Sequence, residues 1–302
     1  MGTDMAVRFA AAGCRVYLMA RPGPGREQFE QRARQAAADL EVRRDALDLG
    51  LASSLAGLPW QEIDLVIENV SEDRRVKHEV FREMVALAKP NTPMASNSST
   101  YSVRVIAEGL ETQERMLGLH FFMPAHLIPL VEVILTDRTN RKMAQEISDG
   151  LSILGFRPVM VQKDVPGFIA NRIQAAMLRE VWHVIDSGIA SPEDVDTAVR
   201  YGFGFRLAAS GPVMQKEMSG LDITAAAGAS LYPDLSKADA PPPALTDKVA
   251  RGECGMKTGK GFWEWNEVRA NAERERYTRA LKAALAILQA EQSGPVEPRG
   301  GE

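Results

Sequence analysis

DLVIENVSEDRRVKHEVFREMVALAKPNTPMASNSS, residues 64–99, is the stretch that decides the fold of this chain. Both of its ends are short apolar runs. Between them, apolar residues recur at helical spacing from Val76 to Leu87, and charged residues occupy the opposite face. A strand, a helix and a second strand in this order form a crossover unit whose two strands run parallel. The stretch therefore predicts a parallel sheet covered by helices.

The same alternation of short apolar runs and helical patterns extends from Met1 to about Val161, with further strands expected at residues 14–20 and 131–135. After the sequence DVPG at residues 164–167, the strand pattern ends and only helical patterns follow. We therefore predict an α/β fold with a Rossmann-type doubly wound parallel sheet, followed by an all-α domain. The predicted boundaries are 1–164 for the dinucleotide-binding domain, 165–270 for the helical domain, and 271–302 for an amphipathic helix with a disordered tail.

The predicted Rossmann-type domain begins without its usual first strand. Residues 1–21 pass from a helix of small residues into an apolar strand, as in the first crossover of that fold. The first strand normally leads into a G-x-G-x-x-G loop that holds a pyrophosphate at a helix N-terminus, and Gly2 can only be the last of these glycines. We expect that the reading frame starts further upstream. The alternatives are a protein that lacks its central strand and, for Gly2, a flexible terminus.

The end of the second strand of a dinucleotide-binding domain distinguishes the two nicotinamide cofactors. An acid there binds the 2′-hydroxyl of NAD, whereas a neutral residue with a nearby arginine accommodates the 2′-phosphate of NADP. This chain has Ala20 followed by Arg21. The pattern makes NADP at least as probable as NAD, although Arg21 also fits a plain surface residue beside a Pro-Gly turn.

Composition limits the classes of partner. The chain has 302 residues, which suggests about two domains, and 36 basic against 40 acidic residues without a basic block, which argues against a nucleic-acid partner. Its apolar runs are too short to span a bilayer. Two distant cysteines, Cys14 and Cys254, favour neither a disulfide framework nor a thiolate metal site. Four histidines lack ligand spacing, so we expect no metal. The low cysteine content fits a reducing compartment, and we expect a cytoplasmic protein.

The segment HFFMP carries His120, and twelve residues later the LVEV strand carries Glu132. An imidazole accepts a proton near neutral pH, and a carboxylate behind it fixes the tautomer and stabilises the imidazolium. A histidine among apolar neighbours is, in isolation, more often a core residue. The surrounding segments favour the catalytic interpretation of this pair.

The chain resembles the 3-hydroxyacyl-CoA dehydrogenase family over almost its whole length. The resemblance depends on six segments in the family's order and nearly at its spacing, namely DLVIENVSED, ASNSS, GLHFFMPAHLIPLVEV, DVPGFIANR, GPVMQKEMSGLD and GKGFW. The family includes dehydrogenases of L-gulonate, carnitine and 3-hydroxybutyryl-CoA. The resemblance thus implies NAD(P)-dependent oxidation of a secondary alcohol that lies β to a carboxyl or thioester carbonyl, in a dimer formed through the helical domain.

The resemblance also implies roles for individual residues. His120 is expected to be the general base, Glu132 its partner carboxylate, Ser99 the hydroxyl that binds the substrate oxygen, and Asn171 an amide near substrate and nicotinamide. The expected cofactor-binding residues are Gly2, Arg21, Glu72, Lys77 and Asn97. Three alternatives stay open: a turn-forming hydroxyl for Ser99, a helix cap for Asn171, and a solvated ion pair at a helix start for Lys77.

One residue departs from the family's pattern. The acyl-CoA enzymes have HFFNP, whereas Met123 here replaces the amide with a thioether that cannot donate a hydrogen bond. Loss of a donor aimed at developing charge costs about 2.7–4 kcal/mol, which argues against an ordinary short-chain acyl-CoA. The nearby His126 could meet a carboxylate of a free acid, or lie in a loop that faces water.

Two functions follow from these observations. The first is interconversion of a 3-hydroxy acid or 3-hydroxyacyl-CoA and its 3-keto form, with a small molecule as the only partner besides a second copy of the chain. The second is a non-catalytic dinucleotide-binding or structural homologue that has lost its phosphate loop. Retention of all four expected catalytic residues favours the enzyme.

Overall fold

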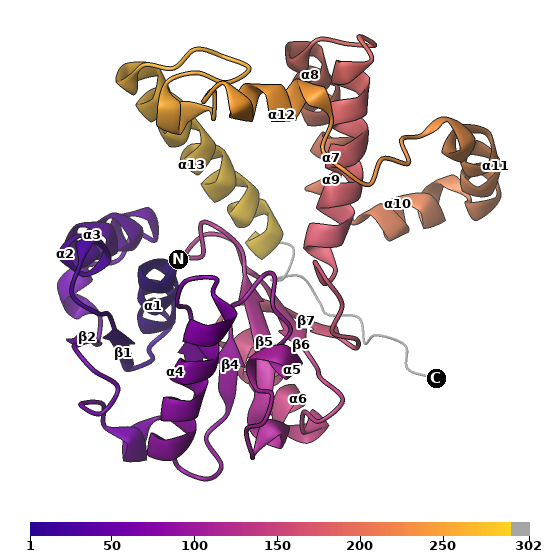
Figure 1. Cartoon of the computed structure of the whole chain (residues 1–302). Coiled ribbons are helices and arrows are strands. Elements are labelled where there is room, and N and C mark those ends of the chain that lie inside the picture. Colours follow the sequence, from indigo (N-terminus) through magenta and orange to yellow (C-terminus); the bar gives the residue numbers. More distant parts are fainter. Residues whose placement is uncertain (291–302) are drawn as a thin grey trace. The chain divides into compact units, whose positions relative to one another are not determined.

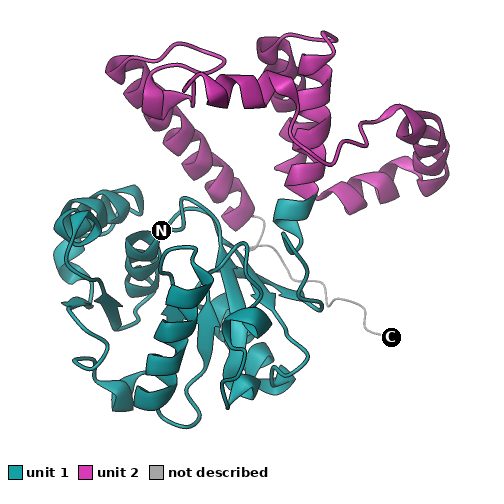
Figure 2. Ribbon diagram, in the orientation of Figure 1, with its two compact units in different colours: residues 1–172 teal, residues 173–302 magenta. Residues whose placement is uncertain are grey.

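The computed structural model describes residues 1–290, which form two compact units (Figure 2). Unit 1 comprises Met1–Arg172 and unit 2 begins at Ile173, eight residues beyond the boundary expected from the sequence. A disordered tail was predicted at the end of 271–302. Residues 291–302 lie outside the described residues.

Unit 1 contains seven strands (Figure 1). They are β1 (Val16–Met19), β2 (Leu49–Ala52), β3 (Val66–Glu68), β4 (Met94–Ser96), β5 (Met116–Phe121), β6 (Leu130–Ile134) and β7 (Arg157–Val161). β1 and β2 form a parallel pair, and β3 to β7 form a second sheet in sequence order. Among the described residues no strand joins the two sheets. All pairs are parallel except β5 with β6, which are antiparallel.

Helices connect these strands, as the alternating pattern predicts. They are α1 (Gly2–Ala11), α2 (Pro24–Glu27), α3 (Phe29–Asp39), α4 (Arg74–Leu87), α5 (Val103–Ile106) and α6 (Arg141–Ile153), with short 3-10 turns at Arg44–Ala46, Trp60–Glu62 and Gln113–Arg115. α4 begins where the Asp73 side chain accepts a hydrogen bond from the Val76 N–H at 3.1 Å. Its Phe81 and Met84 side chains are buried in an apolar cluster that includes Val66 of β3 and Met94 of β4.

Side chains along β5 and β6 alternate between the two faces of the sheet, and this alternation decides which of them are in contact. On one face, Leu117, Leu119 and Phe121 of β5 pack with Val131 and Val133 of β6 in a buried apolar cluster. Because successive side chains of a strand point to opposite faces, the residues between them face away from this cluster. His120 and Glu132 are therefore on the same, opposite face, although both strands are almost wholly buried.

Unit 2 is helical. Its elements are α7 (Ala170–Asp186), which starts in unit 1, α8 (Pro192–Tyr201), α9 (Phe203–Leu207), α10 (Pro212–Ser219), α11 (Leu221–Leu231), α12 (Pro243–Ala250), α13 (Glu267–Ala290) and two 3-10 turns at Tyr232–Asp234 and Met256–Thr258. The Ser191 side chain caps α8, as predicted, by accepting from the Asp194 N–H at 3.1 Å. Trp182 of α7 stacks on Phe262 of the GKGFW segment at 5.6 Å between ring centroids. No helix within residues 1–290 has the length and apolar character that a membrane crossing requires.

The predicted fold class, an α/β unit followed by a helical unit, is confirmed. Residues 14–20, 64–70 and 92–98, expected as strands, contain β1, β3 and β4, and the strand expected at 131–135 is β6, which lies one residue earlier. Three strands, β2, β5 and β7, were not expected. β2 and β7 are partly exposed, whereas β5 is buried at every position and so lacks an alternating pattern. α13 begins at Glu267, before the expected start of the final helix at 271.

The β5–β6 pairing should depend on Gly118. This residue lies opposite Ile134, and a Cβ at Gly118 would meet the Ile134 Cβ at 2.9 Å. We predict that Gly118→Ala pushes the two strands apart and lowers the free energy of unfolding by about 1–3 kcal/mol, as overpacking does. Urea unfolding measures this change.

Gly150→Ala is the matched control. Gly150 lies inside α6, and a Cβ there would have no neighbour within 4 Å. This variant should be about 0.5–1 kcal/mol more stable than the wild type, because alanine is the better helix former. Equal stability of Gly118→Ala and the wild type would contradict the packing argument.

Candidate active site

The candidate site lies at the carboxyl ends of the parallel strands of unit 1. β3 ends at Glu68, β4 ends at Ser96, and His120 is near the end of the neighbouring β5. Ligands of open α/β sheets bind at this edge of the sheet. Three of the residues expected to bind substrate or cofactor follow these strands within four positions, namely Glu72, Asn97 and Ser99, and Lys77 lies in the first turn of α4.

His120 and Glu132 form a buried pair. They are direct partners across the antiparallel β5–β6 ladder, and His120 Nδ1 lies 2.8 Å from Glu132 Oε2. An ionised carboxylate only accepts hydrogen bonds, so Nδ1 carries the proton and Nε2 of the neutral ring has a free lone pair. Nε2 makes no hydrogen bond to any residue within 1–290. The imidazole is flanked by the rings of Phe122 and Phe168, at 4.6 and 5.4 Å between centroids.

The second oxygen of Glu132 is held by backbone. Oε1 accepts hydrogen bonds from the N–H groups of Ile169 at 2.9 Å and Ala170 at 2.8 Å, where α7 begins. Burial alone would raise the pKa of the Glu132 carboxyl. The hydrogen bonds from His120, Ala170 and Ile169 outweigh burial and lower this pKa below its usual value. Glu132 is consequently ionised at neutral pH even though the residue is 1% exposed.

Lys77 is buried, and it is not part of a solvated ion pair. The residue is 1% exposed, and Nζ lies 3.0 and 3.2 Å from the two oxygens of Glu68 and 3.2 Å from Glu72 Oε2. Glu68 also accepts a hydrogen bond from Ser96 Oγ at 2.6 Å. The alternative of an ion pair with Glu72 at a helix start is thus present, but it was wrong that this pair is solvated, because Lys77 is buried. Glu68 was not among the expected site residues, although an acid inside an apolar strand, nine residues before a lysine, was a signal for it.

Glu72 connects this buried pair to the loop after β4. Its Oε1 accepts hydrogen bonds from Ser98 Oγ and from the Thr100 N–H, the latter at 3.0 Å. Burial would raise the pKa of Glu72, but the hydrogen bond from Ser98 and the charge and hydrogen bond of Lys77 lower it overall. Glu72 thus stays ionised and fixes the ASNSS loop.

Asn97 links three strand ends. Its Oδ1 accepts from the Phe121 N–H at 2.8 Å, and its Nδ2 donates to Asn69 Oδ1 at 2.7 Å. Gly2 lies beside the same place, since a Cβ on Gly2 would approach Asn69 Nδ2 to 3.0 Å. The first turn of α1 contains Gly2, so the flexible-terminus interpretation was wrong. A helix N-terminus with a glycine close to polar strand ends fits the phosphates of a dinucleotide.

The side chains of Ser99 and Asn171 make no hydrogen bond within residues 1–290. Ser99 is exposed at the end of the ASNSS loop, and its hydroxyl makes no hydrogen bond to the described residues. Asn171 is half-buried in the first turn of α7, which begins only one residue earlier, at Ala170. Asn171 therefore lies nearer the start of the helix than its sequence pattern suggested. Because Ala170 N–H binds Glu132, Asn171 follows directly after the residue that holds the dyad.

Two expectations for the substrate pocket have different outcomes. The Met123 side chain is 63% exposed just after β5 and remains available to a ligand. The expectation for His126 was wrong in both of its forms, because this side chain neither faces water nor is free to meet a substrate carboxylate. It is buried, with Nε2 3.1 Å from Asp39 Oδ2 and Nδ1 3.9 Å from Asp4 Oδ2. The neighbouring carboxylates of Asp39 and Asp4 would repel a substrate carboxylate.

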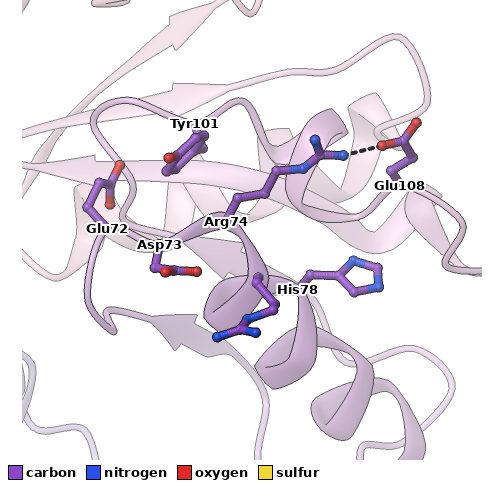
Figure 3. A pocket seen from close by; sticks show the side chains of 7 residues that line it. Glu72, Asp73, Arg74, His78, Tyr101 and Glu108 are labelled. Carbon is purple, nitrogen blue, oxygen red and sulfur yellow. Dashed lines mark hydrogen bonds and ion pairs between the residues drawn. The ribbon is translucent and has the colours of Figure 1, made fainter.

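A polar cavity of about 630 Å³ adjoins the site at Glu72 (Figure 3). Its wall is formed by Glu72, Asp73, Arg74, Arg75, His78, Tyr101 and Glu108, and an Arg74–Glu108 ion pair crosses it. Neither His120 nor Ser99 lines this cavity, so it is separate from the His120–Glu132 pair. No cluster of His, Cys, Asp and Glu within residues 1–290 is arranged to hold a metal ion.

Comparison with protein families agrees with this geometry. Residues 1–165 match the model of the 3-hydroxyacyl-CoA dehydrogenase NAD binding domain, and residues 167–265 match the C-terminal domain of the same enzymes. The chain belongs to the 3-hydroxyacyl-CoA dehydrogenase family. Members are NAD-dependent oxidoreductases that act on CH–OH groups, and this family member is such an enzyme. The non-catalytic alternative is therefore set aside.

The relatives include a dehydrogenase named for a pyridine carboxylate and dehydrogenases named for hydroxyacyl-coenzyme A. This family member is 34% identical over 300 residues to the 5-formyl-3-hydroxy-2-methylpyridine 4-carboxylate 5-dehydrogenase of Mesorhizobium japonicum, covering 96% of this chain and 95% of the relative. A solved structure of a 5-dehydrogenase of that compound, an NAD⁺-dependent dismutase, superposes with a TM-score of 0.90 at 31% identity over 96% and 95% of the two chains. The mitochondrial hydroxyacyl-coenzyme A dehydrogenase of Homo sapiens is 37% identical over 208 residues, 67% of this chain and 64% of the relative.

The Lys77–Glu68 pair should dominate the stability of this edge of the sheet. We predict that Lys77→Met lowers the free energy of unfolding by about 3–5 kcal/mol, since it leaves the Glu68 charge buried without a cation. The double variant Lys77→Met/Glu68→Gln is the matched control and should recover most of the loss. Guanidinium unfolding of the three proteins measures both effects. Equal losses in the single and double variants would show that the pairing is not the cause.

Proposed function

We propose that this enzyme interconverts a 3-hydroxy acid and its 3-oxo form, with His120 as the general base for alcohol oxidation. The observation that carries the proposal is the buried His120–Glu132 pair. It leaves the unprotonated Nε2 of a fixed imidazole without an internal partner. A general base needs this arrangement, because its acceptor atom must be free and its tautomer must be set.

The chain's own groups handle the proton. His120 Nε2 would take the proton of the substrate hydroxyl while the hydride leaves the carbon that bears this hydroxyl. The resulting imidazolium would lie against the Glu132 carboxylate. The free Ser99 hydroxyl and the Asn171 amide are proposed to donate hydrogen bonds to the substrate oxygen, on which negative charge develops. Exclusion of water by the Phe122 and Phe168 rings strengthens these interactions.

The nicotinamide cofactor, when bound, accepts the hydride. We propose that Gly2, Glu72 and Asn97 contribute to its site. Lys77 is proposed to fix the Glu72 carboxylate through their ion pair. Ala20 leaves no acid at the end of β1 to bind a ribose hydroxyl, and Arg21 is exposed beside it. We therefore propose that the enzyme uses NAD and also accepts NADP.

For the substrate we propose a free acid in preference to an acyl-CoA. Met123 cannot donate the hydrogen bond expected at that position in acyl-CoA enzymes. The relative that matches along nearly its whole length is named for a 5-formyl pyridine 4-carboxylate. Formyl and carboxyl groups on adjacent ring carbons place two carbons between the carboxyl carbon and the formyl carbon, one more than in a 3-oxo acid. The two kinds of substrate thus share a free carboxylate close to the reacting carbonyl, although not the same spacing.

A reduction assay tests this proposal. The rate of loss of NADH or NADPH absorbance would be measured with acetoacetate, 2-formylbenzoate and acetoacetyl-CoA. We predict turnover of at least one free acid, with kcat/KM for acetoacetyl-CoA lower by about 10²-fold or more, as expected for a missing donor. Met123→Asn is the matched variant and should raise the activity on acetoacetyl-CoA selectively. Activity on acetoacetyl-CoA alone would contradict the free-acid proposal.

We further propose that the enzyme is a homodimer formed through unit 2. α9, α10 and α12 have no buried residue, and large apolar side chains on α8 to α11 are exposed. They include Tyr201, Phe205, Val213, Met214, Met218, Leu221 and Ile223. An apolar surface of this extent supports association with a second copy.

Light scattering tests the dimer proposal. The wild type should have twice the chain mass, and Phe205→Glu, which puts a charge on the exposed apolar surface, should shift the population toward the monomer. Ile153→Glu is the control, because Ile153 is 86% exposed but lies on α6 of unit 1. A monomeric wild type, or equal dissociation by both variants, would contradict the proposal.

A further inference from the structure

The segment between β7 and α7 adopts an unusual backbone conformation. Gly167 and Phe168 both have positive φ angles, +76° and +47°. Glycine adopts this region freely, but a phenylalanine there is strained. Phe168 is also 6% exposed and packs with Ile134 and Val161, so its conformation is held by the surrounding core. Strained residues of this kind persist only where the rest of the structure determines them, and they cluster at functional sites.

The two residues that follow Phe168 are the ones that hold the dyad. The N–H groups of Ile169 and Ala170 point at the same oxygen of Glu132, at 2.9 and 2.8 Å. Successive N–H groups that converge after a left-handed residue form a concave anion site. The turn is closed by the Phe168 N–H, which donates to the Val165 carbonyl at 3.0 Å. A right-handed or extended Phe168 would aim the next N–H groups elsewhere.

The ring of Phe168 touches the other member of the dyad. Its centroid is 5.4 Å from that of His120, on a ring that Phe122 also contacts. One residue thus acts on Glu132 through its backbone and on His120 through its side chain. The segment is anchored further back, where Ser102 Oγ donates a hydrogen bond to Asp164.

We propose that Phe168 is a positioning residue of the active site, which sets the carboxylate of Glu132 through its left-handed backbone and the plane of His120 through its ring. The proposal rests on the proposed function of His120 as the base. It also explains how the start of α7, with Asn171, is kept in register with the dyad. Phe168 itself donates no group to the reaction.

The test compares Phe168→Leu, Phe168→Tyr and Gly167→Ala with the wild type. Phe168→Leu removes the ring, Phe168→Tyr keeps it, and Gly167→Ala disturbs the turn, because a Cβ there is strained and would meet Arg172 Cγ at 3.1 Å. Phe156→Leu is the matched control, since Phe156 is 0% exposed in the apolar cluster on the other face of the sheet.

One readout does not require activity. The chain has four histidines, so ¹⁵N NMR of the imidazoles, assigned with His120→Asn, reports the tautomer of His120. We expect the wild type and Phe168→Tyr to show the Nδ1-protonated form alone. Phe168→Leu and Gly167→Ala should show both tautomers, and Phe156→Leu should lower the melting temperature without this change. A single unchanged tautomer in Phe168→Leu and Gly167→Ala would overturn the proposal, even if the wild type reduced no substrate in the panel.

The kinetic readout separates positioning from mere stability. In Phe168→Leu, kcat should fall by about 10- to 100-fold, as for a small misplacement of catalytic groups, while the KM for the dinucleotide stays within a factor of about two. In Gly167→Ala, loss of the two N–H groups should also raise the pKa of Glu132, so the low-pH limit of activity should move to higher pH. A lower melting temperature with unchanged kcat and pH profile would reduce Phe168 to a core residue.

Discussion

The antiparallel pairing of β5 with β6 is the constraint on which the rest of the site depends. It places His120 directly opposite Glu132 and gives both residues the same face of the sheet. A shift of one residue along either strand would turn that residue's side chain into the apolar cluster on the other face. Gly118 and Ile134, the next pair with the same orientation, fit together closely enough to fix this register. The geometry of the dyad is thus a consequence of strand packing more than of a loop.

Buried charges surround the candidate site, and each has a partner. Glu132 is satisfied by His120 and two backbone N–H groups, and Glu68 by Lys77 and Ser96. Desolvation would otherwise raise the pKa of Glu132, and its hydrogen bonds lower that pKa and keep this carboxylate ionised. Among the expected catalytic residues, His120 Nε2, the Ser99 hydroxyl and the Asn171 amide make no hydrogen bond to residues 1–290. A site with its internal charges satisfied and its reactive atoms free is prepared for a substrate oxygen.

Much of this arrangement could be predicted from the sequence, and the part that could not has a physical explanation. Periodicity located four of the strands and the start of α8, and six ordered motifs indicated the family and the His120–Glu132 pair. It could not show that Lys77 is buried, because a charged residue at a helix start is usually solvated. Nor could it place His126, whose partner Asp39 is far away in sequence, or the backbone of Phe168, which propensity would never assign to a left-handed conformation.

The most direct test of the central claim is deuterium transfer from the reduced dinucleotide to a 3-oxo acid. Wild-type enzyme and Glu132→Gln would be incubated with NADH deuterated at carbon 4 of the nicotinamide, and the product analysed by mass spectrometry. We predict one deuterium at carbon 3 of the hydroxy acid, formed about 10² to 10⁴ times more slowly by the variant, as for a histidine left in the wrong tautomer. NADH affinity should be equal in both. Equal rates for the two proteins, or no transfer by the wild type, would contradict the role of the dyad.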